Sequence, residues 1–136
     1  MKTEHSLHAA ADATALKGRR GLQRVINAAR YSIDGLRAAW RGEDAFRQEV
    51  LLALVMIPLA IALHVTLVEK IMLIGVVLLV LIVELLNTAV EAAIDRDSTE
   101  INPLGKQAKD LGSAAVMLSL VLAGGTWVAI LAANLS

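Results

Sequence analysis

Four polar residues recur at helical spacing directly after a long apolar segment. Residues 71–83 contain no charged side chain, and Glu84, Asn87, Glu91 and Asp95 follow them at steps of three, four and four. On a helix this spacing places the four side chains on one face. A carboxylate at membrane depth costs roughly 2.5–3.5 kcal/mol on insertion scales. This ladder of four residues therefore predicts a bound cation or a reacting group that offsets the cost.

Further charged residues are expected at the level of the ladder. Glu43 precedes the first apolar segment, and Lys109 and Asp110 precede the last one. Mg²⁺ commonly takes one or two carboxylates together with phosphates and water, so Glu43 and Glu91 predict a magnesium site across two helices. Lysine suits phosphate as a point charge. Glu84, which lies deeper, is at the right depth to act as general base for a lipid hydroxyl.

Each of these groups also has a structural interpretation. Glu84 and Asn87 suit hydrogen bonds between helices that specify assembly. Glu43, Asp95 and Asp110 suit ordinary solvated charges at an interface. The sequence contains no GxxxxGK[ST] loop, GxGxxG turn or HExxH motif, which excludes the common nucleotide-binding and metal signatures. From these residues alone, the chain is a small membrane protein with a cation-binding carboxylate cluster on one side.

The composition indicates a membrane protein. The chain has 136 residues, of which 57% are hydrophobic and 3% aromatic, and its mean hydropathy is +0.62. A soluble domain of this length has too little interior to bury so much aliphatic surface. The absence of cysteine excludes disulfides and thiolate metal sites. We expect one all-α domain whose partner is the lipid bilayer, with no nucleic acid.

Three apolar segments are long enough to cross a bilayer. The predicted spans are about 45–64, 71–94 and 111–135. A tight turn at 65–70 and a polar loop at 95–110 connect them, the loop carrying turn signals at Asn102 and Pro103. Small residues at the start of the third span allow close helix approach. Trp127 is expected to anchor that span at the far interface.

The chain before the first span is predicted to have two parts. Residues 1–20 are expected to form a mobile polar tail, and residues 21–136 the membrane domain. Apolar residues then recur at three- and four-residue steps over about 22–41, with arginines among them, which predicts an amphipathic helix in the membrane interface. The apolar positions are Leu22, Val25, Ile26, Ala29, Ile33, Leu36 and Trp40. A soluble helix packed on a partner is the alternative.

Lysine and arginine are distributed unevenly. Twelve of the thirteen lie in the amino-terminal segment or in the 95–110 loop, and only Lys70 lies in the 65–70 turn. The positive-inside tendency therefore places the amino terminus and the 95–110 loop in the cytoplasm.

Four segments resemble the prokaryotic diacylglycerol kinase family. They are RYSIDGLRAAW at 30–40, EDAFRQE at 43–49, ELLNTAVE at 84–91 and AKDLGSAA at 108–115. The resemblance covers about residues 22–133, and the ladder followed by A-K-D-x-G-S-A-A is a highly specific pattern. It implies three spans, an interfacial helix and a homotrimer in the bacterial inner membrane. The implied reaction transfers the γ-phosphate of ATP to diacylglycerol and gives phosphatidate.

The resemblance also implies roles for individual residues. Glu84 is the implied general base, and Glu43 and Glu91 the implied ligands of the Mg²⁺ bound to ATP. The implied ATP-binding residues are Arg24, Tyr31, Glu43, Glu91, Glu100, Ile101, Asn102, Lys109 and Asp110. The implied lipid-binding residues are Arg24, Trp40, Gln48, Glu84, Asn87 and Ser113, with Asp95 as the remaining residue of the ladder. Sites in the family lie between subunits, so Glu43 can serve a neighbour's site.

One position departs from the family pattern. Asn102 stands where the family carries a histidine. Because asparagine keeps hydrogen-bonding capacity, we expect this change to affect nucleotide affinity more than the chemistry.

Two other functions are open. An undecaprenol kinase is the enzymatic alternative, although residues 46–49 favour the diacylglycerol branch by resemblance. A cation-conducting or structural oligomer is the non-enzymatic alternative. Glu43 and the Lys109–Asp110 pair argue against a pore, which does not need them.

Overall fold

The computed structural model describes residues 2–97 and 102–136, which form four helices. They are α1 (Lys2–Gly42), α2 (Asp44–Ala62), α3 (Leu67–Asp97) and α4 (Pro103–Leu135). α2, α3 and α4 are each long and apolar enough to cross a membrane. The all-α fold with three spans is therefore confirmed. The chain divides into two units, residues 1–38 and 39–136.

The first unit is formed by helix α1 up to residue 38, and this helix is longer than the sequence predicted. It begins at Lys2, about twenty residues before the expected start at 22, across the segment expected to be a tail. Five alanines between residues 9 and 15 favour this extension, because alanine has the highest helix propensity. The apolar residues at 22–36 are exposed, and their binding to a membrane interface stays a prediction.

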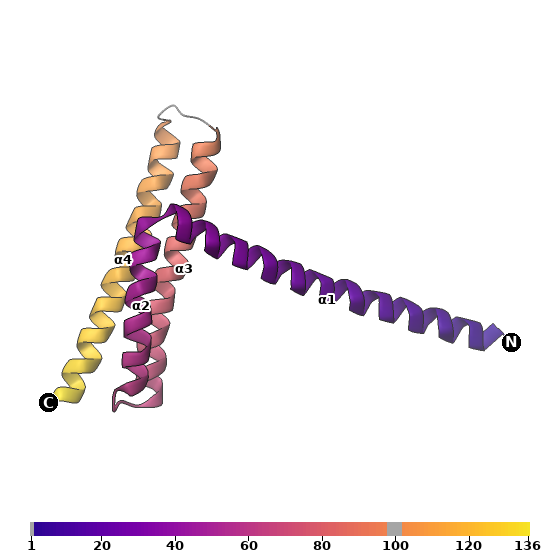
Figure 1. Cartoon of the computed structure of the whole chain (residues 1–136), viewed down its shortest axis with the longest axis horizontal. Helices are drawn as coiled ribbons and strands as arrows, with labels where there is room; N and C mark the ends of the chain where they lie inside the picture. The colour runs from indigo at the N-terminus through magenta and orange to yellow at the C-terminus, as the bar shows by residue number, and fades with distance from the viewer. Residues whose placement is uncertain (1, 98–101) are drawn as a thin grey trace. The chain divides into compact units, whose positions relative to one another are not determined.

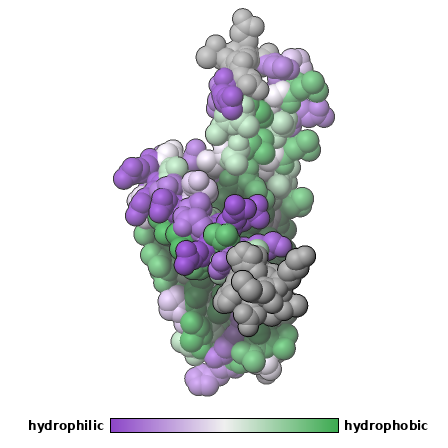
Figure 2. Space-filling view, turned by 90° about the vertical axis from the view of Figure 1, so that its right-hand side faces the viewer, coloured by the Kyte–Doolittle hydropathy of each residue, from purple (hydrophilic) through white to green (hydrophobic). Residues whose placement is uncertain are grey.

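The second unit is the bundle of α2, α3 and α4, in which α3 packs against both neighbours (Figure 1). Its core is small, and its buried members are Ala60, Leu73, Trp127 and Ile130. Most large apolar side chains of the three helices are exposed, and Figure 2 shows hydrophobic side chains along the visible face of the bundle. Such a surface suits contact with lipid tails, which are as apolar as leucine.

Polar side chains fasten the bundle at the turn between α2 and α3. The Lys70 Nζ donates to the carbonyl of Ile61 at 2.7 Å, which satisfies a free carbonyl at the end of α2. The Glu69 carboxylate accepts from the backbone N–H and the hydroxyl of Thr66, both at 2.8 Å. It also accepts from the Asn134 Nδ2 at 3.1 Å. The end of α4 is thereby tied to the beginning of α3.

The connection at the opposite end is shorter than the predicted 95–110 loop. α3 continues to Asp97, and α4 begins at Pro103. The Asn102 Oδ1 accepts from the backbone N–H of Leu104 at 2.9 Å, and proline stands at the first helical position. Asparagine before proline is therefore a helix start here rather than a loop turn, because both residues suit a helix amino terminus.

Trp127 lies in the bundle core, although the sequence predicted an interfacial anchor. Its side chain is only 5% exposed, and its indole N–H donates to the carbonyl of Leu73 at 3.2 Å. The buried indole needs such a partner because an unpaired N–H in an apolar interior is costly. This bond joins α4 to α3 in the interior of the bundle.

Replacing Trp127 by phenylalanine is expected to lower the free energy of unfolding by about 1–3 kcal/mol, because the interhelical hydrogen bond is lost and the smaller ring leaves part of the indole's space empty. Equilibrium unfolding in detergent micelles measures the change. Trp40→Phe is the matched control, since Trp40 is 43% exposed and should lose little. Equal effects of the two substitutions would contradict the role given to the Trp127 bond.

Candidate active site

The ladder lies on one helix, as its spacing predicted. All four of its residues belong to α3. Glu84 is 5% exposed, Asn87 and Glu91 are half-buried, and Asp95 is exposed. The side chains thus pass from the bundle interior to its surface along a single rigid helix. Glu84 is a buried carboxylate in an apolar helix, which is a functional-site signal in a membrane protein.

Three further carboxylates lie within electrostatic range of Glu84. Its carboxylate lies within Coulombic range of Glu43 and Glu91, and the Glu49 carboxylate lies within range of Glu84. The Glu49 Oε2 is buried with no hydrogen-bond partner. Like charges repel one another, so a cation bound among them would lower the electrostatic cost of this cluster. We call Glu43, Glu49, Glu84 and Glu91 the carboxylate cluster.

Glu49 is the member of this cluster that the sequence analysis did not assign to the site. Like Glu84, Glu49 is an acidic residue at the edge of an apolar segment, and this position could have marked it as a candidate site residue. The ladder residues recur at helical spacing on α3, whereas Glu49 on α2 is not part of such a repeat. Its proximity to Glu84 depends on how α2 packs against α3, which the spacing of residues does not give.

The carboxylate cluster fits a metal that arrives with a nucleotide better than a metal held by protein alone. Within residues 2–97 and 102–136, no three histidine, cysteine, aspartate or glutamate side chains gather closely enough to hold a metal ion. Mg²⁺ needs fewer protein ligands when phosphates and waters complete its shell. The Asn87 Nδ2 donates to the Glu91 Oε1 at 3.4 Å, which helps orient that carboxylate. Glu43 and Glu91 offer carboxylate oxygens, the type of ligand that Mg²⁺ takes, and both lie within electrostatic range of Glu84.

Gly112 allows α4 to approach the ladder closely. A Cβ atom at this position would collide with the Asn87 Oδ1. That oxygen is buried and has no hydrogen-bond partner, so the amide is confined between Glu91 and the backbone of α4. The small residues that the sequence predicted for helix contact thus set the position of one ladder residue.

Two ion pairs lie on the same side of the bundle as the exposed end of the ladder. The Lys109 Nζ is 2.5 Å from the Asp95 Oδ1, and the Lys106 Nζ is 2.6 Å from the Asp110 Oδ2. All four side chains are well exposed, and exposed pairs contribute only about 0–1 kcal/mol. A phosphate can therefore compete for either lysine at low cost.

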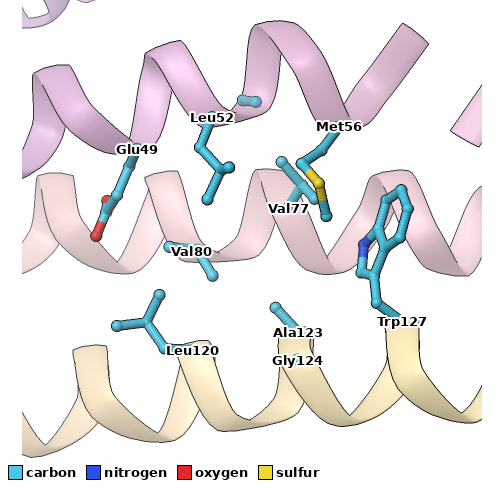
Figure 3. A pocket seen from close by; sticks show the side chains of 10 residues that line it. Glu49, Leu52, Met56, Val77, Val80, Leu120, Ala123, Gly124 and Trp127 are labelled. Atoms are coloured by element: carbon cyan, nitrogen blue, oxygen red, sulfur yellow. The ribbon is translucent and has the colours of Figure 1, made fainter. Parts of the chain in front are cut away.

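An apolar crevice opens beside Glu49. Its volume is about 210 Å³, and its lining comes from α2, α3 and α4. Figure 3 shows Glu49 at one end and Trp127 at the other, with aliphatic side chains between them. The Glu49 carboxylate is the one charged group of this lining. An apolar space thus begins next to the carboxylate cluster.

Comparison with known proteins identifies the family. Residues 30–131 match the sequence profile described as "Prokaryotic diacylglycerol kinase". The chain belongs to the prokaryotic diacylglycerol kinase family. It is 54% identical over 115 residues to the "Diacylglycerol kinase" of Pseudomonas aeruginosa, which covers 85% of this chain and 94% of the relative. It is 47% identical over 111 residues to that of Escherichia coli K12, covering 82% and 91%.

The structure brings part of the set implied by the family resemblance into one place. Glu84, Asn87 and Glu91 belong to the ladder, and Glu43 lies within electrostatic range of Glu84. Trp40, Gln48, Asp110 and Ser113 are exposed residues of the second unit, and Asn102 caps α4. Arg24 and Tyr31 are exposed residues of the first unit. Glu100 and Ile101 lie outside the described residues.

Gly112→Ala is expected to lower activity roughly tenfold or more, because the added Cβ displaces the Asn87 amide from its place beside Glu91. The free energy of unfolding should change little, since the displaced atom ends a flexible side chain and alanine favours the helix. Turnover and thermal stability measured on the same sample test this. Gly75→Ala, where a Cβ meets nothing within 4 Å, is the control. A loss of activity that only parallels a loss of stability would refute the positioning role.

Proposed function

We propose that this protein transfers the γ-phosphate of ATP to the free hydroxyl of diacylglycerol and gives phosphatidate. The observation that carries the proposal is the buried Glu84 carboxylate, held among like charges on an apolar helix. Membership of the family and the names of the relatives support the reaction and both substrates. A lipid hydroxyl lies near the membrane surface, which is where a base on such a helix can reach it.

Glu84 is the proposed general base. Its carboxylate accepts the proton of the diacylglycerol hydroxyl while that oxygen forms a bond to the γ-phosphorus. The bond between the γ-phosphorus and the bridging oxygen of ADP breaks on the opposite side, so that ADP leaves with that electron pair. The proton on Glu84 is then released to solvent. Such a transfer needs positioning and charge neutralisation and no covalent enzyme intermediate.

Glu43 and Glu91 are the proposed ligands of the Mg²⁺ that accompanies ATP. When bound, this ion neutralises negative charge on the phosphates. Asn87 holds the Glu91 carboxylate through the bond described above. The repulsion within the carboxylate cluster supports this assignment, because a divalent cation relieves it.

The remaining assignments follow the family resemblance. Lys109 is proposed to leave Asp95 for a phosphate of the nucleotide, which their exposure makes inexpensive. The other proposed nucleotide contacts are Arg24, Tyr31, Glu100, Ile101, Asn102 and Asp110. The proposed lipid contacts besides Glu84 are Arg24, Trp40, Gln48, Asn87 and Ser113.

We further propose a homotrimer in the bacterial inner membrane. The amino terminus and the connection between α3 and α4 face the cytoplasm in this proposal, because nearly all lysines and arginines lie on that side. ATP is then available at the exposed end of the ladder. The active sites are proposed to lie between subunits, as in the family.

Phosphate transfer in mixed micelles tests the function. Purified protein is supplied with Mg²⁺ and ATP, and with diacylglycerol or undecaprenol as acceptor, and the phosphorylated lipid is measured. We expect phosphatidate. Transfer only to undecaprenol would assign the other acceptor, and transfer to neither lipid would refute the kinase.

Glu84→Gln is expected to abolish turnover and to leave binding of Mg²⁺-ATP largely intact. The substitution keeps the shape of the side chain and removes the proton acceptor. It also removes a buried charge, so the thermal stability should rise rather than fall. Glu69→Gln, at the opposite end of α3, is the control and should keep its turnover. Loss of nucleotide binding in step with turnover would instead make Glu84 a metal ligand or a structural residue.

Glu91→Gln is expected to raise the Mg²⁺ concentration needed for half-maximal activity by roughly tenfold, because one anionic ligand becomes neutral. Titration of activity with Mg²⁺ at fixed ATP measures the shift. Asp44→Asn is the matched control: Asp44 adjoins Glu43 in the chain but pairs with Arg47. An unchanged requirement in Glu91→Gln would exclude Glu91 as a ligand.

A further inference from the structure

The crevice beside Glu49 is walled on one side by a single face of α4. Leu120, Ala123, Gly124 and Trp127 line it, and their spacing of three and four residues puts them on one helix face. Gly125 belongs to a different face, which turns toward a shallow outer groove with Met72. The two adjacent glycines therefore border different spaces.

The crevice is open at Gly124 because this residue has no side chain. A Cβ atom built there meets nothing within 4 Å. Any larger residue on this face would extend into the space between Ala123 and Trp127 (Figure 3). Gly124 thus contributes no side-chain atoms to this end of the crevice.

Both ends of the crevice are chemically defined. At one end lies Glu49, whose carboxylate is within Coulombic range of Glu84. At the other end lies Trp127, whose indole is held against Leu73 by its hydrogen bond. A lipid whose hydroxyl reaches the Glu84 carboxylate can therefore extend its apolar part from Glu49 toward Trp127.

The dimensions suit the beginning of an acyl chain. The lining on α2 runs from Glu49 to Met56, about 10 Å along the helix axis at 1.5 Å per residue. An apolar cavity of about 150 Å³ in another protein holds a benzene ring. By the same proportion, the 210 Å³ measured here accommodates roughly eight carbon atoms.

We propose that Gly124 is a specificity-determining residue, which keeps the crevice between α2, α3 and α4 open for an acyl chain of the lipid substrate. This inference rests on the proposed function, because it takes the hydroxyl of that lipid to lie at Glu84. The apolar lining, the position of Glu49 beside Glu84 and the empty space at Gly124 support this occupant.

Kinetics with lipids of different chain length test the proposal. Gly124→Leu fills the Trp127 end and displaces about two methylenes, which should raise KM for dioctanoylglycerol and dioleoylglycerol roughly tenfold. KM for dibutyrylglycerol, whose chains are too short to reach Gly124, and KM for ATP should not change. Gly125→Leu is the matched control, since its Cβ is equally free of contacts but points away from the crevice, and it should resemble the wild type with all three lipids.

The failures of the two proposals are distinguishable. If the wild-type protein phosphorylates none of the three lipids, the proposed function fails. If the wild type is active and Gly124→Leu matches it at every chain length, or loses kcat equally for all three lipids, the inference about Gly124 fails.

A second measurement avoids the bulky substitution. The chain contains no cysteine, so Gly124→Cys and Gly125→Cys each offer one thiol to N-ethylmaleimide. Dioctanoylglycerol should slow the labelling of Gly124→Cys at least severalfold and leave Gly125→Cys unaffected. Equal labelling of Gly124→Cys with and without lipid would overturn the proposal. So would labelling that depends only on protein concentration, because a second copy of the chain would then occupy the crevice.

Discussion

The burial of one carboxylate within a membrane helix is the constraint on which the rest of the structure depends. Glu84 is shielded from water, and isolated ionised groups are not tolerated in such surroundings without compensation. The charged groups that act on it electrostatically are also carboxylates, so they add to the cost of its ionised form. The site is therefore prepared for positive charge from outside the chain. In the proposed function, a bound cation and a proton from the lipid hydroxyl would compensate for this cost.

The bundle tolerates this arrangement because it is fastened away from the cluster. At the turn between α2 and α3, Glu69 accepts hydrogen bonds from Thr66 and from Asn134 on α4. Lys70 donates one to the carbonyl of Ile61 on α2. Trp127 adds a bond between α3 and α4 in the interior. Between these contacts and the carboxylate cluster, the helices enclose a crevice in place of a filled core. The hydrogen bonds at the turn between α2 and α3 hold the helices together, and the crevice leaves space beside Glu49.

The sequence predicted those features that depend on one helix and not those that depend on two. Glu84 to Asp95 share a face whatever α3 packs against, so their common helix and their graded burial were predictable from spacing alone. The cluster position of Glu49 and the burial of Trp127 depend on contacts between α2, α3 and α4, which periodicity does not contain. The short connection at Asn102 was missed because asparagine and proline serve both loop turns and helix starts, and the spacing of residues does not say which of the two they form here.

The seven helical steps from Glu84 to Glu91 match the proposed reaction in length. They correspond to about 10 Å along the helix axis. In an in-line transfer, a base contacts the hydroxyl oxygen at about 3 Å, and that oxygen approaches the phosphorus at about 3–3.5 Å. A phosphate oxygen and the cation that Glu91 would hold would extend this sequence of atoms further. Two glutamates two turns apart on one rigid helix can therefore hold the opposite ends of this sequence of atoms. In the proposed reaction, the helix itself would fix how far a lipid hydroxyl and a nucleotide phosphate stand from each other, which neither substrate can do alone.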